Sequence, residues 1–176
     1  ASHNAPRYNG VKMKASYGGS ASTNQNRRVE QHIEGNLESA RGPNLMSMES
    51  AIAEGRITKF DPSWAYYEHI STLVDLDCIS SAELRVVADG MYGAGRGIIG
   101  EVLARGRTKI HNIRHEMNPG FGGIHPEPIA KHLGLLMSTI QAGHWGVGLA
   151  TDGDADRIGA VDALGNFVDP HRIFAL

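Results

Sequence analysis

Hydrophobic residues in the first sixty positions recur mainly at helical spacing. Val29, Ile33 and Leu37 stand four residues apart, which predicts an amphipathic helix, with Thr23 or Asn24 as its cap. A second, short helix is predicted around residues 48–53. Ahead of both helices, residues 11–14 alternate apolar and basic side chains, which predicts a half-exposed strand.

A third helix is expected to begin at Asp61-Pro62, because aspartate caps helix N-termini and proline fits the first helical turn. The side chains expected on its buried face are Trp64, Tyr67, Ile70 and Val74. The connection before this helix marks the expected domain boundary, which divides the chain into residues 1–59 and 60–176.

From residue 84 onward, compact apolar runs alternate with helical stripes. Strands are predicted over residues 84–88, 109–114, 147–150 and 158–161. A helical face begins at Ile98, and Pro126-Glu127-Pro128 is expected to open another helix. The buried face expected for that second helix consists of Ile129, Leu133, Leu136 and Ile140. This order predicts an α/β fold with a mixed, mostly parallel sheet and helices on both faces.

The segment between the last two predicted strands holds three aspartates at alternate positions, Asp152, Asp154 and Asp156. Their charges repel one another, and a hard divalent cation with oxygen ligands would neutralise them. A solvated acidic turn is the alternative, since Asp and Gly are common in turns. The adjacent Arg157 favours a shared anionic ligand such as phosphate. Ligands of parallel sheets gather beyond the carboxyl ends of strands, where this loop is expected to lie.

Composition excludes several classes of protein. The 176 residues are 41% hydrophobic and 20% charged, with a formal net charge of -2. The chain has no cluster of like charges that would indicate binding to nucleic acid. Its apolar stretches are all well below the about 18 residues that a membrane helix needs. The single cysteine, Cys78, excludes an intramolecular disulfide, so we expect a reducing, cytoplasmic location. Both ends look cut, which predicts a piece of a longer protein.

Of two other site motifs, an EF-hand calcium loop is excluded, and a dinucleotide-binding loop matches only in part. Counted from Asp152, an EF-hand loop requires Gly at its sixth position and Glu at its twelfth, where this chain has Arg157 and Ala163. Residues 95–100 match the G-x-G-x-x-G pattern of dinucleotide-binding loops, with Glu116 placed for a ribose. Six residues separate this match from the preceding strand, so a glycine turn for close helix–sheet packing is the favoured alternative.

The N-terminal segment offers a candidate nucleophile. Ser2 stands beside His3 and ahead of Lys12, so a serine with basic neighbours could attack an electrophile. An ordinary polar loop is the alternative interpretation.

Taken together, the serine segment and the acidic loop resemble the α-D-phosphohexomutases, a superfamily that includes phosphoglucomutase, phosphomannomutase and phosphoglucosamine mutase. Residues 2–4 with Lys12 resemble the active-site serine loop, and residues 152–157 resemble the metal-binding loop. The intervening segments 93–95, 121–123 and 126–128 are also similar to family sequence, in the same order. One departure is Ala5, which stands where the family usually has proline, so we expect a slightly altered backbone there.

The resemblance implies an intramolecular phosphotransferase that interconverts hexose 1-phosphate and hexose 6-phosphate through a phosphoserine and a hexose 1,6-bisphosphate. Ser2 would carry the phosphoryl group and complete a Mg²⁺ site with the three aspartates. Lys12 matches the general acid and base, His3 the serine-adjacent histidine, and Arg157 the arginine beside the phosphoserine. The implied metal ligands are therefore Ser2, Asp152, Asp154 and Asp156.

The same resemblance implies that the chain holds two of the family's four domains. Residues 1–59 would form the later part of the first domain, and residues 60–176 the second. The family's sugar-reading loop lies in its third domain, so glucose, mannose and glucosamine phosphates all stay open, as does the oligomeric state. We expect the fragment alone to be inactive. A nucleotide-binding domain that uses residues 95–100, or a noncatalytic relative, is the alternative function.

Overall fold

The computed structural model describes residues 4–8 and 10–176, which form two compact units. The smaller unit is Gly10–Pro62, and the larger unit is Ser63–Leu176 together with residues 4–8. The units divide after Pro62, and the domain boundary expected at residues 59 and 60 stays a prediction. Among the described residues, no helix has the length and apolar character needed to cross a membrane.

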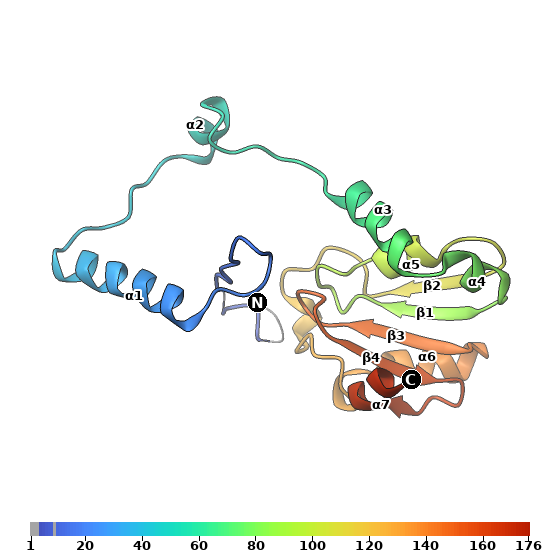
Figure 1. The fold of residues 1–176 in the computed structure, drawn as a ribbon. Coiled ribbons are helices and arrows are strands. Elements are labelled where there is room, and N and C mark those ends of the chain that lie inside the picture. Colours follow the sequence, from blue (N-terminus) through green and yellow to red (C-terminus); the bar gives the residue numbers. More distant parts are fainter. Residues whose placement is uncertain (1–3, 9) are drawn as a thin grey trace. The chain divides into compact units, whose positions relative to one another are not determined.

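The smaller unit contains α1 (Thr23–Glu38) and α2 (Met48–Ala53) (Figure 1). The predicted caps, Thr23 or Asn24, are wrong, because Ser22 caps α1 in a reciprocal capping box with Gln25. The predicted apolar stripe lies on α1, but its members are 39%, 53% and 72% exposed at Val29, Ile33 and Leu37. Helical spacing identifies an apolar face without showing what covers it.

The strand predicted over residues 11–14 is wrong. In the described part of this segment, the β pairing is a single bridge between Lys14 and Ser20. Two backbone bonds, Ala21 N–H to Met13 O and Ala15 N–H to Gly19 O, close a tight hairpin-like turn around it. Alternation of side chains does not make a strand when no continuous partner ladder accompanies it.

The larger unit is built on a five-stranded mixed sheet with the strand order β2-β1-β3-β4-β5 (Figure 1). The strands are β1 (Arg85–Asp89), β2 (Lys109–Ile113), β3 (Val147–Thr151), β4 (Ile158–Asp162) and β5 (Phe167–Val168). β2, β1 and β3 run parallel, whereas β4 and β5 are antiparallel to their neighbours. The sequence-based expectation of a mixed α/β fold is confirmed.

Helices cover both faces of this sheet. On one face, α6 (Gly134–Gly143) packs Leu136 and Ile140 against the sheet residues Val87 and Val161, and all four side chains are fully buried. α5 (Ile98–Leu103) lies against β2, where a Cβ added to Gly100 would come within 2.5 Å of the Asn112 side chain. In the ladder, Ala88 pairs with Asn112 and Val87 with His111, so Asn112 points away from the α6 face.

The remaining helical segments are α3 (Ser63–Leu73), α4 (Leu76–Ser81), α7 (Pro170–Ala175) and the 3₁₀ turns η1 (Phe121–Gly123) and η2 (Ala130–His132). The buried face predicted for α3 is wrong, because no α3 residue is buried and Trp64 is 78% exposed. As with α1, the spacing correctly predicted a helix but not a partner for it.

The predicted start of the next helix, at Pro126-Glu127-Pro128, is also wrong, because α6 begins at Gly134. A residue that precedes proline is disfavoured in the helical region, which applies to Glu127 here. Ile129 is extended, with φ -109° and ψ 159°, and is 36% exposed. Leu133 and the two α6 residues in the core are fully buried, as predicted.

Candidate metal centre

Three loops meet at one edge of the sheet. Because β1, β2 and β3 are parallel, their carboxyl ends lie along the same edge. The loops that leave this edge are residues 90–97, 114–129 and 152–157. The acidic loop therefore lies at the edge where ligands of parallel sheets gather, as expected from the sequence.

A buried ion pair ties the first two loops together. Asp89 ends β1 and Arg114 follows β2, and their side chains are 0% and 6% exposed. Arg114 Nε donates to Asp89 Oδ1 at 2.8 Å, Nη2 contacts Oδ2, and Nη1 donates to the His132 carbonyl at 3.2 Å. Asp89 Oδ1 also accepts the Met91 N–H at 3.0 Å. A buried pair with these extra hydrogen bonds fixes the geometry of the loops.

The acidic loop folds around the carboxylate of its first aspartate. Asp152 is fully buried, and its Oδ1 accepts the backbone N–H groups of Asp156 at 3.0 Å and Arg157 at 3.2 Å. Ala155 adopts a left-handed conformation with φ 61°, which turns the chain back towards β4. Asp152 therefore organises the loop and also presents a carboxylate to it.

Both neighbouring loops hold the acidic loop by its backbone. The Ala94 N–H donates to the Gly153 carbonyl at 2.9 Å, and the Gly153 N–H donates to the Pro126 carbonyl at 3.1 Å. On the first of these loops, a Cβ added to Gly93 would lie 2.8 Å from the carbonyl oxygens of Asp152 and Gly153. Only glycine permits this approach without displacing the backbone of the loop.

The three aspartates converge. One carboxylate oxygen from each of Asp152, Asp154 and Asp156 lies within 4.8 Å of the others. Mg²⁺ binds its oxygen ligands at about 2.1 Å, so two opposite ligands are roughly 4.2 Å apart. The separation of the carboxylate oxygens, at most 4.8 Å, is close to this value. An all-oxygen set with three negative charges suits a hard divalent cation, so these residues fit a Mg²⁺ ion.

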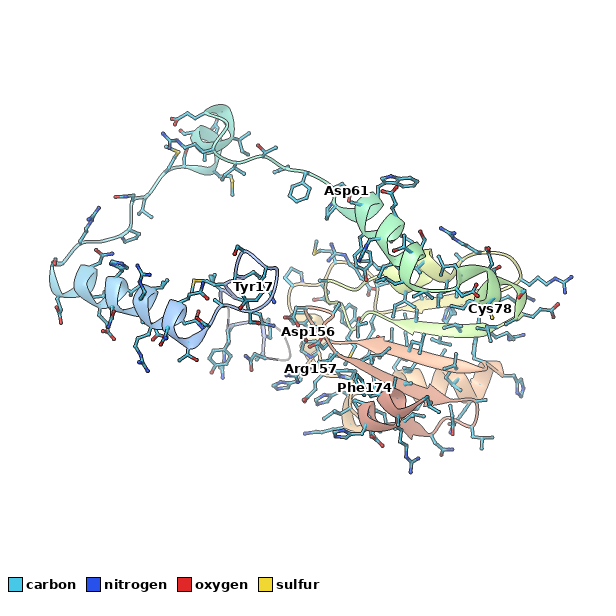
Figure 2. The ribbon with its side chains drawn as sticks, in the orientation of Figure 1. Tyr17, Asp61, Cys78, Asp156, Arg157 and Phe174 are labelled. Atoms are coloured by element: carbon cyan, nitrogen blue, oxygen red, sulfur yellow. The ribbon has the colours of Figure 1, made fainter. Side chains whose placement is uncertain are left out.

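Arg157 lies directly beside this cluster, at the end of the loop (Figure 2). Its backbone N–H is held by Asp152, while its Nη1 lies 3.9 Å from Glu127 Oε1 on the neighbouring loop. The Arg157 side chain is 49% exposed, which leaves it accessible to an anionic ligand.

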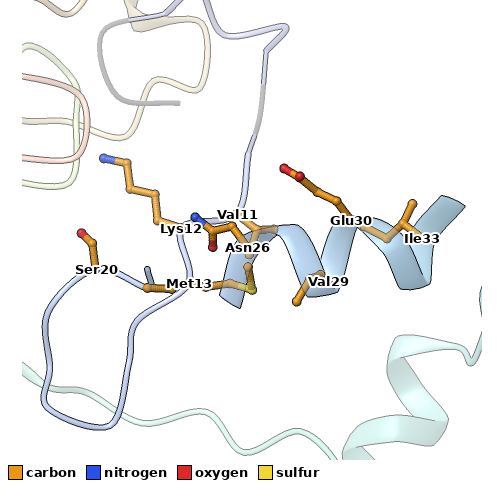
Figure 3. Close-up of a pocket in the computed structure, with 9 residues that line it drawn as sticks. Val11, Lys12, Met13, Ser20, Asn26, Val29, Glu30 and Ile33 are labelled. Carbon is orange, nitrogen blue, oxygen red and sulfur yellow. The ribbon is translucent and has the colours of Figure 1, made fainter. Parts of the chain in front are cut away.

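Three further site residues were predicted from the sequence, Ser2, His3 and Lys12. Ser2 and His3 lie outside the described residues. Lys12 belongs to the smaller unit, where it lines an open pocket of about 630 Å³ together with apolar residues of α1 (Figure 3). Its side chain extends away from Val29 and Ile33 (Figure 3).

The glycines of residues 95–100 each have a structural reason. A Cβ on Gly95 would lie 2.5 Å from Thr151 Oγ1, and Gly97 caps α5 in a left-handed conformation with φ 77°. Gly100 packs on Asn112, as described above. These contacts agree with the packing interpretation of this motif.

Sequence reasoning did not assign roles to Asp89, Arg114 or Glu127. For the buried pair, a signal was present, because Asp89 directly follows one predicted strand and Arg114 ends another. For Glu127 the only signal was its place in a proline-flanked segment.

Comparisons with known proteins cover both parts of the chain. The family model described as phosphoglucomutase/phosphomannomutase, alpha/beta/alpha domain II, matches residues 64–165, and the domain I model of the same family matches residues 1–40. The chain is 31% identical to the "Probable phosphoglucosamine mutase" of Methanopyrus kandleri, over 100% of the chain and 36% of that protein. With its counterpart from Thermococcus kodakarensis the identity is 34%, over 100% of the chain and 36% of that protein.

A solved structure agrees with these sequence matches. The crystal structure of a "putative phosphomannomutase" from Thermus thermophilus superposes with a TM-score of 0.78 and 32% identity, covering 97% of this chain and 37% of that one. The chain thus spans little more than a third of the length of the relatives it matches.

Proposed function

The chain belongs to the phosphoglucomutase/phosphomannomutase family, and we propose that it is part of a phosphohexomutase that interconverts hexose 1-phosphate and hexose 6-phosphate. The observation that carries the proposal is the convergence of three aspartate carboxylates beside Arg157, within the segment that matches domain II. A phosphoryl group in transfer requires positioning and charge neutralisation, and this loop offers residues for both.

The proposed metal site consists of Asp152, Asp154 and Asp156, with a phosphate oxygen carried on Ser2 as the fourth ligand. When bound, Mg²⁺ would offset the negative charge on that phosphate. Asp152 holds the loop in shape through its two backbone hydrogen bonds, so its carboxylate is oriented before the ion arrives. Asp154 and Asp156 supply the remaining carboxylates.

The protein's other residues would act on the phosphate and the sugar. Arg157 donates hydrogen bonds to the phosphate on Ser2 and so balances its charge. His3, next to the serine, contributes a further polar group. Lys12 accepts the proton of the attacking sugar hydroxyl and returns a proton in the reverse half-reaction.

In the proposed cycle, the phosphoryl group leaves Ser2 Oγ for the free hydroxyl of the hexose phosphate, which gives a hexose 1,6-bisphosphate. The sugar reorients, and its other phosphoryl group returns to Ser2. One P–O bond forms and one breaks in each half, so the enzyme ends as it began. Glucose, mannose and glucosamine phosphates are the candidate substrates.

The test is a mutase assay on the full-length protein that contains this chain. The 1-phosphates of glucose, mannose and glucosamine are supplied with Mg²⁺, and formation of the 6-phosphate is followed. We expect turnover of at least one substrate, loss of turnover in Ser2→Ala, and loss on chelation of the metal. A matched variant on an exposed helical serine, Ser138→Ala, should retain the wild-type rate. Absence of turnover with all three sugars, or an active Ser2→Ala variant, would contradict the proposal.

A further inference from the structure

Two of the three loops at the sheet edge are joined by an ion pair that the proposed function does not use. Glu127 lies on the loop after β2 and Arg157 on the acidic loop after β3, and Glu127 Oε1 is 3.9 Å from Arg157 Nη1. The two side chains are 31% and 49% exposed. The pair therefore sits at the rim of the candidate metal centre and not in the protein core.

The backbone of Glu127 is rigidly held. Its N–H donates to the His125 carbonyl at 2.8 Å, and its own carbonyl accepts the Ile129 N–H at 2.9 Å and faces His132 Nδ1 at 3.2 Å. The flanking Pro126 and Pro128 are both buried. A carboxylate on such a segment has a defined position from which to orient a flexible partner.

The same segment is fixed to the acidic loop itself. The Pro126 carbonyl accepts the Gly153 N–H at 3.1 Å, and the Pro128 carbonyl lies against Gly159 of β4, so close that a Cβ there would overlap it. Glu127 stands between these two contacts. The backbone of Glu127 is therefore fixed relative to the acidic loop.

An arginine directly after three aspartates needs such a partner. The long Arg157 side chain begins beside the cluster, and its positive charge is attracted to the same carboxylates that would hold a cation. We infer that Glu127 is a positioning residue that draws the Arg157 guanidinium outward and orients it towards the phosphate. This inference rests on the proposed function.

The chemistry of arginine allows both contacts at once. A guanidinium carries five N–H donors in a planar fork, so one edge can face Glu127 while another faces a phosphate. A half-exposed ion pair contributes little to folding stability because solvent screens it. Loss of the Glu127 charge is therefore expected to change phosphoryl transfer much more than the melting temperature.

The test is a double-mutant cycle in the full-length protein with Glu127→Gln, Arg157→Lys and the combined variant. We expect Glu127→Gln to lower kcat/KM about tenfold, since misplaced catalytic groups lose rate steeply. In the Arg157→Lys background, Glu127→Gln should cause no further loss, because the two residues act as a unit. Glu83→Gln is the matched control and should behave as wild type. It removes an exposed ion pair with Arg107, which lies near the amino ends of β1 and β2 and so at the opposite end of the strands from the acidic loop.

A second readout does not depend on activity. The ¹⁵N relaxation of Arg157 Nε, assigned by its disappearance in Arg157→Lys, should show a more mobile guanidinium in Glu127→Gln. An unchanged kcat/KM in Glu127→Gln, multiplicative losses in the double variant, or unchanged Arg157 mobility would overturn the inference. A wild-type protein without mutase activity would instead refute the proposed function, and the relaxation measurement would still decide the role of Glu127.

Discussion

Gly93 is the residue at which the loop after β1 touches the acidic loop most closely. Replacement by alanine would place a Cβ 2.8 Å from two carbonyl oxygens of that loop, so the loop must move. We expect Gly93→Ala to lower the free energy of unfolding by about 1–3 kcal/mol, which is typical of overpacking. The same displacement should weaken binding of Mg²⁺ or Mn²⁺.

Urea unfolding and isothermal titration calorimetry measure these two effects. Gly134→Ala serves as the control, because no atom lies within 4 Å of a Cβ at that position and alanine favours the helix that begins there. Wild-type stability together with wild-type metal affinity in Gly93→Ala would show that the contact does not shape the loop.

Asp162 gives the protein a predictable pH dependence. Its pKa is lowered, first by the Asn166 backbone N–H, then by the Asn166 side-chain amide and the N–H groups of Leu164 and Gly165. Because the folded pKa lies below the unfolded value of about 3.9, the stabilisation is present above about pH 4 and is lost as pH falls through the folded pKa.

Asp162→Asn should remove this component of the pH dependence, since the amide does not titrate. The free energy of unfolding measured at several pH values below about pH 5 should then fall less steeply for the variant than for the wild type. Parallel curves for the two proteins would contradict this assignment.

At the scale of single residues, what could be predicted depended on sequence separation. Asp152, Asp154 and Asp156 lie within five consecutive positions, so their convergence followed from a tight loop between two strands. The Glu127–Arg157 and Asp89–Arg114 pairs each join two different loops. Their formation depends on strand order and register, which no local pattern contains.

Among the elements, α6 carries the packing that supports the site. Leu136 is fully buried in the cluster formed with Val87, Ile140 and Val161. We expect Leu136→Ala to lower the free energy of unfolding by about 2–5 kcal/mol, through lost burial and an unfilled cavity. Leu135→Ala, at a neighbouring position that is 51% exposed, should change it by no more than about 0.5 kcal/mol. Equal effects of the two substitutions in denaturant unfolding would contradict this account of the core.

The elements also show why periodicity predicted some features and not others. The strand–loop–strand unit around the acidic loop follows from two apolar runs, and β3 and β4 lie where they were expected. The start of α6 was mispredicted because Pro126 and Pro128 were taken as helix openers, whereas they stiffen an extended segment against β4. The apolar face of α3 was expected to be buried, but burial requires a partner surface, and no α3 residue is buried.

At the scale of the whole molecule, the chain contains the three converging aspartates but spans little more than a third of the length of its relatives. By the family resemblance, the sugar-reading loop lies in the third domain, whereas this chain matches domains I and II. We therefore expect the purified 176-residue chain to show no turnover of glucose 1-phosphate, although its acidic loop should still bind a divalent cation. Measurable turnover by this chain alone would show that the later domains are dispensable.

The most direct test of the acidic loop is whether it supports phosphoryl transfer to Ser2. Full-length protein would be incubated with a hexose 1,6-bisphosphate and Mg²⁺, and intact-mass analysis with peptide mapping would locate any phosphate. We predict one phosphate on Ser2 in the wild type and a much slower gain in Asp154→Asn, with both proteins equally folded. No phosphate on Ser2, or equal rates of phosphorylation in the two proteins, would contradict the account.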